Sequence, residues 1–142
     1  MREYVRLQTA ILLRRFAFQV NRAARSGDAD SIHDLRVAIR RLSRCLGVFS
    51  QFYPGRSWKK IRRELADLMD AAGAVRDRDI ALELLAAAGI PKSAAIVTRL
   101  QEERRKAGEE LLLEIRRWKG RSFSRKWRIR LDLLPPTGPR SS

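Results

Sequence analysis

The chain of 142 residues has little of the chemistry that builds disulfide or metal scaffolds: it contains a single cysteine, Cys45, and a single histidine, His33. One cysteine cannot form an intramolecular disulfide, and the two residues together are too few for the usual closed zinc sites. No apolar run is long enough to span a bilayer, and residues 1–8 lack the apolar core of a signal peptide. We therefore expect a cytoplasmic protein with no membrane span, no metal and no cofactor, in which Cys45 is a small core residue.

Acidic residues are also scarce relative to basic ones. The 16 Asp and Glu residues are outnumbered by 31 Lys and Arg, which gives a formal net charge of +15. Such an excess repels itself in the compact state unless a polyanion or counterions relieve it. The composition therefore points to nucleic acid, polyphosphate, an acidic membrane or an acidic protein as the partner.

The sequence shows no strand-like alternation, no glycine-rich phosphate loop and no long repeat, whereas its apolar residues recur at helical spacing. Helices are expected over residues 4–25, 31–50, 57–88 and 93–119, and a short last helix is expected near Phe123 and Trp127. The expected fold is all-α, an antiparallel helical bundle of four long helices plus a short C-terminal helix. It forms a single domain over residues 1–134, and residues 135–142 are expected to be a disordered tail.

Local signals refine these helices. Asp30 or Ser31 is expected to cap the second helix and Ser57 the third. Gly73 is expected to bend or interrupt the third helix, which then ends before Gly89 and Pro91. The three tryptophans each join an apolar stripe, so we expect them in the core or at an interface: Trp58, Trp118 and Trp127.

The helix expected over 31–50 carries charge of one sign along one face. At 100° per residue, a basic stripe lies opposite an apolar one and contains no acid, with the members His33, Arg36, Arg40 and Arg44. By contrast, the helix expected over 93–119 interleaves glutamates with its arginines, as a solvated face does. Spacings of three and four residues repeat the guanidiniums about every 5–6 Å, which suits an extended phosphate chain. We expect His33, near the start of the helix, to donate a hydrogen bond to a phosphate oxygen.

The start of the third helix is basic as well. Lys59, Lys60, Arg62 and Arg63 fall in its first two turns, where the helix dipole disfavours cations. Cations placed there at a cost to stability indicate a ligand.

Two segments together resemble a known family. SIHDLRVAIRRLSR, residues 31–44, and LMDAAGAVRDRDI, residues 68–80, are similar to the two hallmark segments of the CHAD domain, the conserved histidine α-helical domain. The resemblance implies a helical module that binds inorganic polyphosphate without catalysis and is often associated with polyphosphate granules. It implies the site residues His33, Arg36, Arg40, Arg41, Arg44, Arg62, Arg63 and Arg76, to which the basic helix start adds Lys59.

The chain departs from the family in length. A typical member is about twice as long and contains two such helical units, whereas this chain offers one. A second apolar stripe on the first helix, formed by Leu7, Ile11 and Phe18, indicates a further buried contact with another helix or a second subunit. We therefore expect a homodimer.

Two other functions compete with polyphosphate binding. A nucleic-acid-binding protein would use the same basic surface on any phosphate backbone. An enzyme that processes phosphoanhydrides is a third alternative, although the chain lacks a Walker loop and a convincing carboxylate cluster for Mg²⁺. Asp77 and Asp79 are instead expected to form salt bridges with Arg76, Arg78 or the basic helix. We therefore expect no catalytic activity.

Overall fold

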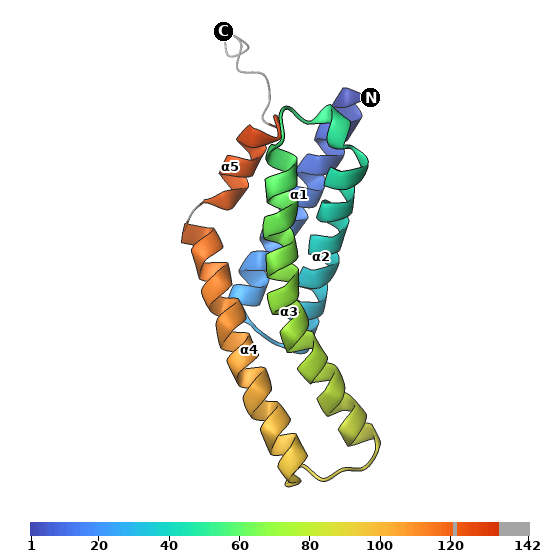
Figure 1. Ribbon diagram of the computed structural model, residues 1–142, viewed down its shortest axis with the longest axis vertical. Helices are drawn as coiled ribbons and strands as arrows, with labels where there is room; N and C mark the ends of the chain where they lie inside the picture. Colours follow the sequence, from blue (N-terminus) through green and yellow to red (C-terminus); the bar gives the residue numbers. More distant parts are fainter. Residues whose placement is uncertain (121, 134–142) are drawn as a thin grey trace.

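The computed structural model describes residues 1–120 and 122–133. The expected tail at 135–142 and the basic residue Arg121 lie outside the described residues. The helices are α1 (Arg2–Arg25), α2 (Ala29–Val48), α3 (Ser57–Ala87), α4 (Ala95–Gly120) and α5 (Phe123–Arg130). A short 3-10 turn, η1 (Ser50–Phe52), lies between α2 and α3. The described residues contain no strand, and the predicted all-α bundle of four long helices plus a short C-terminal helix is confirmed (Figure 1).

The helices pack mainly with their neighbours in sequence. Helices α1, α2 and α3 run antiparallel side by side, and α4 packs chiefly along α3 (Figure 1). Helix α3 has 31 residues against 20 in α2, so its second half projects beyond the loop between α1 and α2 together with the start of α4 (Figure 1). Helix α5 folds back beside the start of α3 (Figure 1). The basic residues of α5 and those at the start of α3 therefore lie at the same end of the molecule.

Aromatic rings hold α5 in place. Trp127 of α5 stacks on Phe16 of α1 with ring centroids 5.9 Å apart, and it meets Trp118 of α4 edge-on at 5.2 Å. Trp118 and Trp127 are both buried, and Trp58 is half-buried against the core. The prediction that the tryptophans are core residues is therefore confirmed, and their rings add pairwise aromatic stabilisation to the area they bury.

A small polar cluster is buried between α1, α2 and the segment after η1. The Thr9 hydroxyl donates to the carbonyl of Val5 at 2.7 Å, which leaves it to accept the phenol proton of Tyr53 at 2.7 Å. Cys45 lies beside both hydroxyls and is buried, as expected for a small core residue. Burial raises the pKa of Tyr53, because the phenolate form would lose its hydration.

Two predicted helix caps are wrong. Asp28 caps α2, since its carboxylate accepts the backbone N–H of Ser31 at 2.8 Å, and neither Asp30 nor Ser31 does so. Helix α3 begins at Ser57 itself, so Arg56 occupies the cap position without making a side-chain hydrogen bond. Asp28, Asp30 and Ser31 stand close together in the sequence, and all three are residue types that cap helices. Only the Asp28 side chain accepts the backbone N–H three residues later, as an N-cap does.

Gly73 does not interrupt α3, which is continuous from Ser57 to Ala87. The helix ends as expected at Gly89, whose φ of +78° suits a residue without a Cβ. The N–H groups of Gly89 and Ile90 donate to carbonyls of the last turn, both at 3.0 Å, and satisfy them. Gly73 instead lies inside the helix, facing Arg36 of α2.

Candidate functional site

The two sides of the seam between α2 and α3 are joined by an arginine of α3. Arg62 reaches across to α2, where its Nε donates to the Ser43 hydroxyl at 3.3 Å. Its Nη1 lies only 2.9 Å from the point that a Cβ on Gly47 would occupy. The guanidinium therefore lies over Gly47 because this glycine has no side chain.

A second arginine crosses the seam in the opposite direction. Arg36 of α2 places Nη2 3.9 Å from the point that a Cβ on Gly73 of α3 would occupy. Arg36 is half-buried, and its Nε is buried without a hydrogen-bond partner among the described residues. A guanidinium with an N–H group that lacks a hydrogen-bond acceptor would be stabilised by a ligand that supplies one. Both crossings fit the same antiparallel register of α2 and α3.

The remaining members of the basic stripe point outward. His33, Arg40 and Arg44 are exposed, and no carboxylate of the described residues pairs with them. They lie on the part of α2 that adjoins the seam, so the predicted stripe is present as a row of unpaired basic groups. We call His33, Arg36, Arg40 and Arg44 the basic row.

A hollow of about 580 Å³ lies where the start of α3 meets the last turns of α2. We call it the α2–α3 hollow; its lining is Ser43, Arg56, Trp58, Lys59, Arg62, Arg63 and Ala66. Three of the predicted site residues, Lys59, Arg62 and Arg63, thus come together. No carboxylate belongs to this described lining, and the first turn of α3 contains no acid.

Arg56 also lines the hollow, although the sequence analysis did not name it as a candidate. It precedes α3 and therefore belongs to no helical stripe, although it begins the basic run that continues at Lys59. Its position just before the cation-rich start of α3 is the sequence feature that could have identified it.

Two predicted site residues, Arg41 and Arg76, belong neither to the hollow nor to the basic row. Arg41 turns toward α1 and lines a different groove, between α1 and α2. Arg76 is half-buried on α3, with Nη1 4.0 Å from a carboxylate oxygen of Glu83, so its charge is partly offset. Ser43 of the hollow directly precedes Arg44 of the basic row on α2, so we treat the row and the hollow as one candidate surface that excludes Arg41 and Arg76.

The start of α2 does not offer His33 the expected anion site. His33 is the fifth residue of α2, and the carboxylate of Asp28 already accepts the Ser31 N–H at the helix start. That hydrogen bond lowers the pKa of Asp28, which stays ionised and holds the negative charge that the helix dipole favours. His33 can still contact an anion from the exposed face, but not together with free backbone groups of the first turn.

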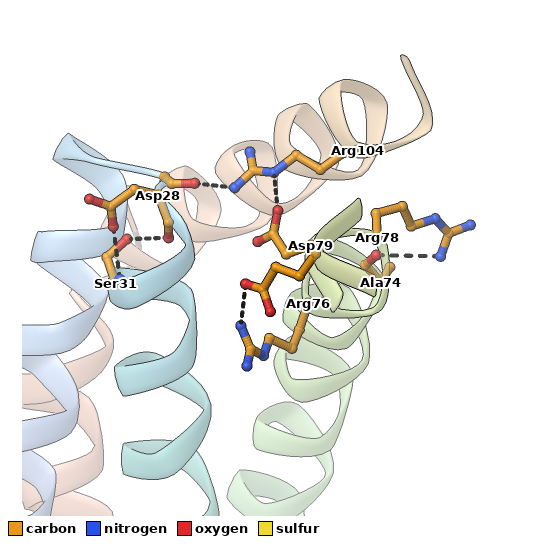
Figure 2. A network of polar contacts seen from close by, with 9 residues as sticks. Asp28, Ser31, Ala74, Arg76, Arg78, Asp79 and Arg104 are labelled. Carbon is orange, nitrogen blue, oxygen red and sulfur yellow. Dashed lines mark hydrogen bonds and ion pairs between the residues drawn. The ribbon is translucent and has the colours of Figure 1, made fainter. Parts of the chain in front are cut away.

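Asp79 takes part in a different network from the one expected (Figure 2), and Asp77 is exposed with no ion pair among the described residues. Asp79 accepts a hydrogen bond from Nε of Arg104 on α4 at 3.0 Å, and Arg104 also donates to the carbonyl of Gly27 (Figure 2). The predicted pairing of Asp79 with Arg76, Arg78 or the basic helix is therefore wrong. The network joins α4 to α3 and to the loop between α1 and α2.

The charges of α4 differ from those of the α2–α3 surface. Arg105 pairs with Glu102 and Glu109, and Arg117 pairs with Glu114 at 3.2 Å. The balanced outer face predicted for this helix is confirmed, and the excess charge of the chain is concentrated elsewhere. In the described part of the chain, no three His, Cys, Asp or Glu side chains gather closely enough to hold a metal ion.

Comparisons with known proteins agree with the geometry at the level of the family. None of the helices in residues 1–120 and 122–133 is long and apolar enough to cross a membrane. Searches of curated proteins and of solved structures find no match. The family model described as the CHAD domain matches residues 9–142, nearly the whole chain. CHAD domains are associated with polyphosphate binding and related functions. The chain belongs to the CHAD domain family.

Proposed function

We propose that the surface formed by the basic row and the α2–α3 hollow binds inorganic polyphosphate without catalysis. The observation that supports this most directly is the hollow itself, where cations of α3 converge without a carboxylate among the described lining residues. Arg36, Arg40 and Arg44 continue the surface along α2 at intervals of four residues, or about 6 Å of helix. Polyphosphate carries roughly one negative charge per phosphate, so one surface can engage several successive units.

Arginine fits this ligand better than lysine does. The planar guanidinium can donate to two phosphate oxygens at once, and it is always charged. Arg62 and Arg36 are also held in place by the seam, since each lies over a glycine of the opposite helix. A guanidinium that is already ordered loses less side-chain entropy when an anion binds.

Nucleic-acid binding is the second candidate, and Trp58 is the observation that favours it. This tryptophan is half-buried and lines the hollow beside Lys59 and Arg62. A base can stack on an accessible indole while arginines contact the backbone, whereas polyphosphate has no base. Trp58→Leu therefore distinguishes nucleic-acid binding from polyphosphate binding. The substitution should weaken RNA binding and leave polyphosphate binding nearly unchanged.

The main experiment compares two double substitutions of equal charge. Arg40→Glu with Arg44→Glu alters the basic row, and Lys106→Glu with Arg116→Glu alters exposed positions of α4 by the same charge. Polyphosphate affinity at physiological salt should fall by more than about tenfold only in the first variant. An equal loss in both, or equal affinity of the unaltered protein for polyphosphate, RNA, DNA and heparin, would mean generic attraction by net charge.

Three finer expectations follow from the same proposal. A phosphate-release assay with polyphosphate and Mg²⁺ should give no product, because binding is proposed to be non-catalytic. A fluorescent fusion should gather at polyphosphate granules in the cytoplasm, and Arg40→Glu with Arg44→Glu should disperse it. The homodimer stays a prediction, which light scattering with and without polyphosphate tests.

A further inference from the structure

The groove between α1 and α2 has no part in the proposed polyphosphate surface. It has a volume of about 500 Å³, and its lining is mostly apolar, with Leu12 and Phe18 from α1 and Val37 and Ala38 from α2. Phe18 is 59% exposed and Leu7, about three turns nearer the start of α1, is 61% exposed. Two members of the second apolar stripe predicted for this helix are thus left exposed by the described part of the chain, and Ile11 is half-buried. Exposed aromatic and aliphatic side chains along a groove are typical of interaction surfaces.

Cations border this groove. Arg14, Arg15 and Arg41 line it and are exposed, and none has a carboxylate partner among the described residues. One carboxylate of the described chain lines the groove, that of Asp34, and it is already paired with Arg22. The groove therefore combines an apolar floor with an unbalanced positive border.

We propose that the α1–α2 groove docks an amphipathic helix of another protein, one with acidic residues on both sides of an apolar stripe. Two packed helices leave a groove into which a third helix can lay its apolar ridge. Phe18, Leu12 and Val37 would receive the apolar side chains, and the three arginines would pair with the flanking acids. A bare polyanion would satisfy the arginines but would leave the apolar floor uncovered.

A second copy of this chain fits the groove less well. It would bring the same arginines against Arg14, Arg15 and Arg41, at the cost of like-charge repulsion. The helix that carries most of its glutamates, α4, already uses Glu102, Glu109 and Glu114 in ion pairs with its own arginines. Charge complementarity therefore favours a partner with free acids.

The groove and the α2–α3 hollow lie on opposite flanks of α2. Arg41 faces α1 and lines the groove, whereas Ser43 faces α3 and contacts Arg62. Both surfaces can therefore be occupied at once. The proposed docking does not depend on the function proposed for the basic row.

The test uses the full chain and two synthetic peptides of identical composition. In one peptide, leucines at i, i+3, i+4 and i+7 form a stripe flanked by glutamates; in the other, the same residues are scrambled so that no stripe forms. Fluorescence anisotropy at physiological salt should show about tenfold tighter binding of the striped peptide. Equal affinities would overturn the proposal, because both peptides carry the same charge.

Variants locate the binding. Phe18→Ser and Arg41→Ser should each abolish the preference for the striped peptide and leave polyphosphate affinity nearly unchanged. Ile129→Ser and Arg116→Ser, which alter an exposed apolar and an exposed basic position elsewhere, should preserve the preference. If Arg40→Glu with Arg44→Glu removes the preference instead, the groove is not the site. If the free protein is a dimer that Phe18→Ser dissociates, a second copy covers the groove and the proposal is wrong.

Discussion

Arg36 of α2 lies over Gly73 of α3, with Nη2 3.9 Å from the point where a Cβ would stand. The same relationship recurs in reverse between Arg62 and Gly47, at 2.9 Å. Gly47 thus provides clearance for the guanidinium that crosses the seam from α3, whereas the guanidinium that crosses from α2 leaves room at Gly73. The difference in distance means that a methyl group fits at Gly73 but collides with the arginine at Gly47.

Alanine substitutions at Gly73 and Gly47 should have different effects on stability and on polyphosphate affinity. Gly73→Ala should stabilise the fold by about 0.5–1 kcal/mol, because alanine loses less backbone entropy in a helix and its methyl group makes ordinary contact with Arg36. Gly47→Ala should gain a similar helix preference but displace the guanidinium of Arg62. Thermal unfolding and polyphosphate titration check both, and polyphosphate affinity should fall only for Gly47→Ala. An unchanged affinity in that variant would mean that the position of Arg62 over Gly47 does not contribute to binding.

His33 should contribute to polyphosphate binding by donating a hydrogen bond from its exposed imidazole to a phosphate oxygen. His33→Ala should weaken polyphosphate affinity by up to about fivefold, since an exposed contact with a charged group contributes about 0.2–1 kcal/mol. Titrations of both proteins with polyphosphate at pH 6 and pH 8 measure this loss. If the variant keeps the same affinity as the unaltered protein at both pH values, His33 does not contact the ligand.

Arg104 should contribute more to stability than its partner Asp79. The Asp79 side chain is 12% exposed and its Oδ2 has no hydrogen-bond partner among the described residues, so Arg104→Ala would leave a buried carboxylate unpaired. The expected cost is about 3 kcal/mol. Asp79→Ala should cost about 1–2 kcal/mol, because Arg104 is more exposed and keeps the carbonyl of Gly27.

Denaturant unfolding of both single variants and the double variant measures this coupling. The double variant should be more stable than Arg104→Ala alone, since it removes the unpaired carboxylate. Equal costs for the two single variants would contradict the asymmetry.

Tyr53 should make the fold sensitive to alkali. Burial raises the pKa of its phenol above the ordinary value of 10.0, so the folded state holds the proton more tightly than the unfolded state does. Its contribution to stability is complete below about pH 10 and is lost as the pH rises from there toward the folded-state pKa. Tyr53→Phe should cost about 1 kcal/mol at neutral pH, because the hydrogen bond to Thr9 is lost. In urea unfolding above pH 10, that variant should lose less stability than the unaltered protein.

The sequence was informative wherever helical periodicity alone decides the outcome. The apolar stripes located the helices, and the basic row came from the spacing of Arg36, Arg40 and Arg44. Arg40 and Arg41 show where periodicity is insufficient. They are adjacent in sequence, but Arg41 lines the groove against α1 whereas Arg40 does not. Only the arrangement of the helices in space shows which of the two arginines faces the neighbouring helix.

Other features depend on partners far away in the chain. A glycine inside a helix reads as a break unless the residue that packs over it is known, and at Gly73 that residue is Arg36. The partner of Asp79 is 25 residues away on α4, whereas closer arginines were available. Local sequence identifies a carboxylate that needs a cation, and tertiary packing selects the cation.

Because α3 is longer than the helices packed against it, its two halves differ in local stability. The buried residues of α3 are confined to the part from Ile61 to Val75, and the part from Arg76 to Ala87 contributes none. Amide hydrogens in the first part should exchange only when the whole domain unfolds, whereas those near Leu84 can exchange through local opening. The tip of the α3–α4 hairpin can therefore open and reclose while the guanidiniums over Gly47 and Gly73 keep their positions.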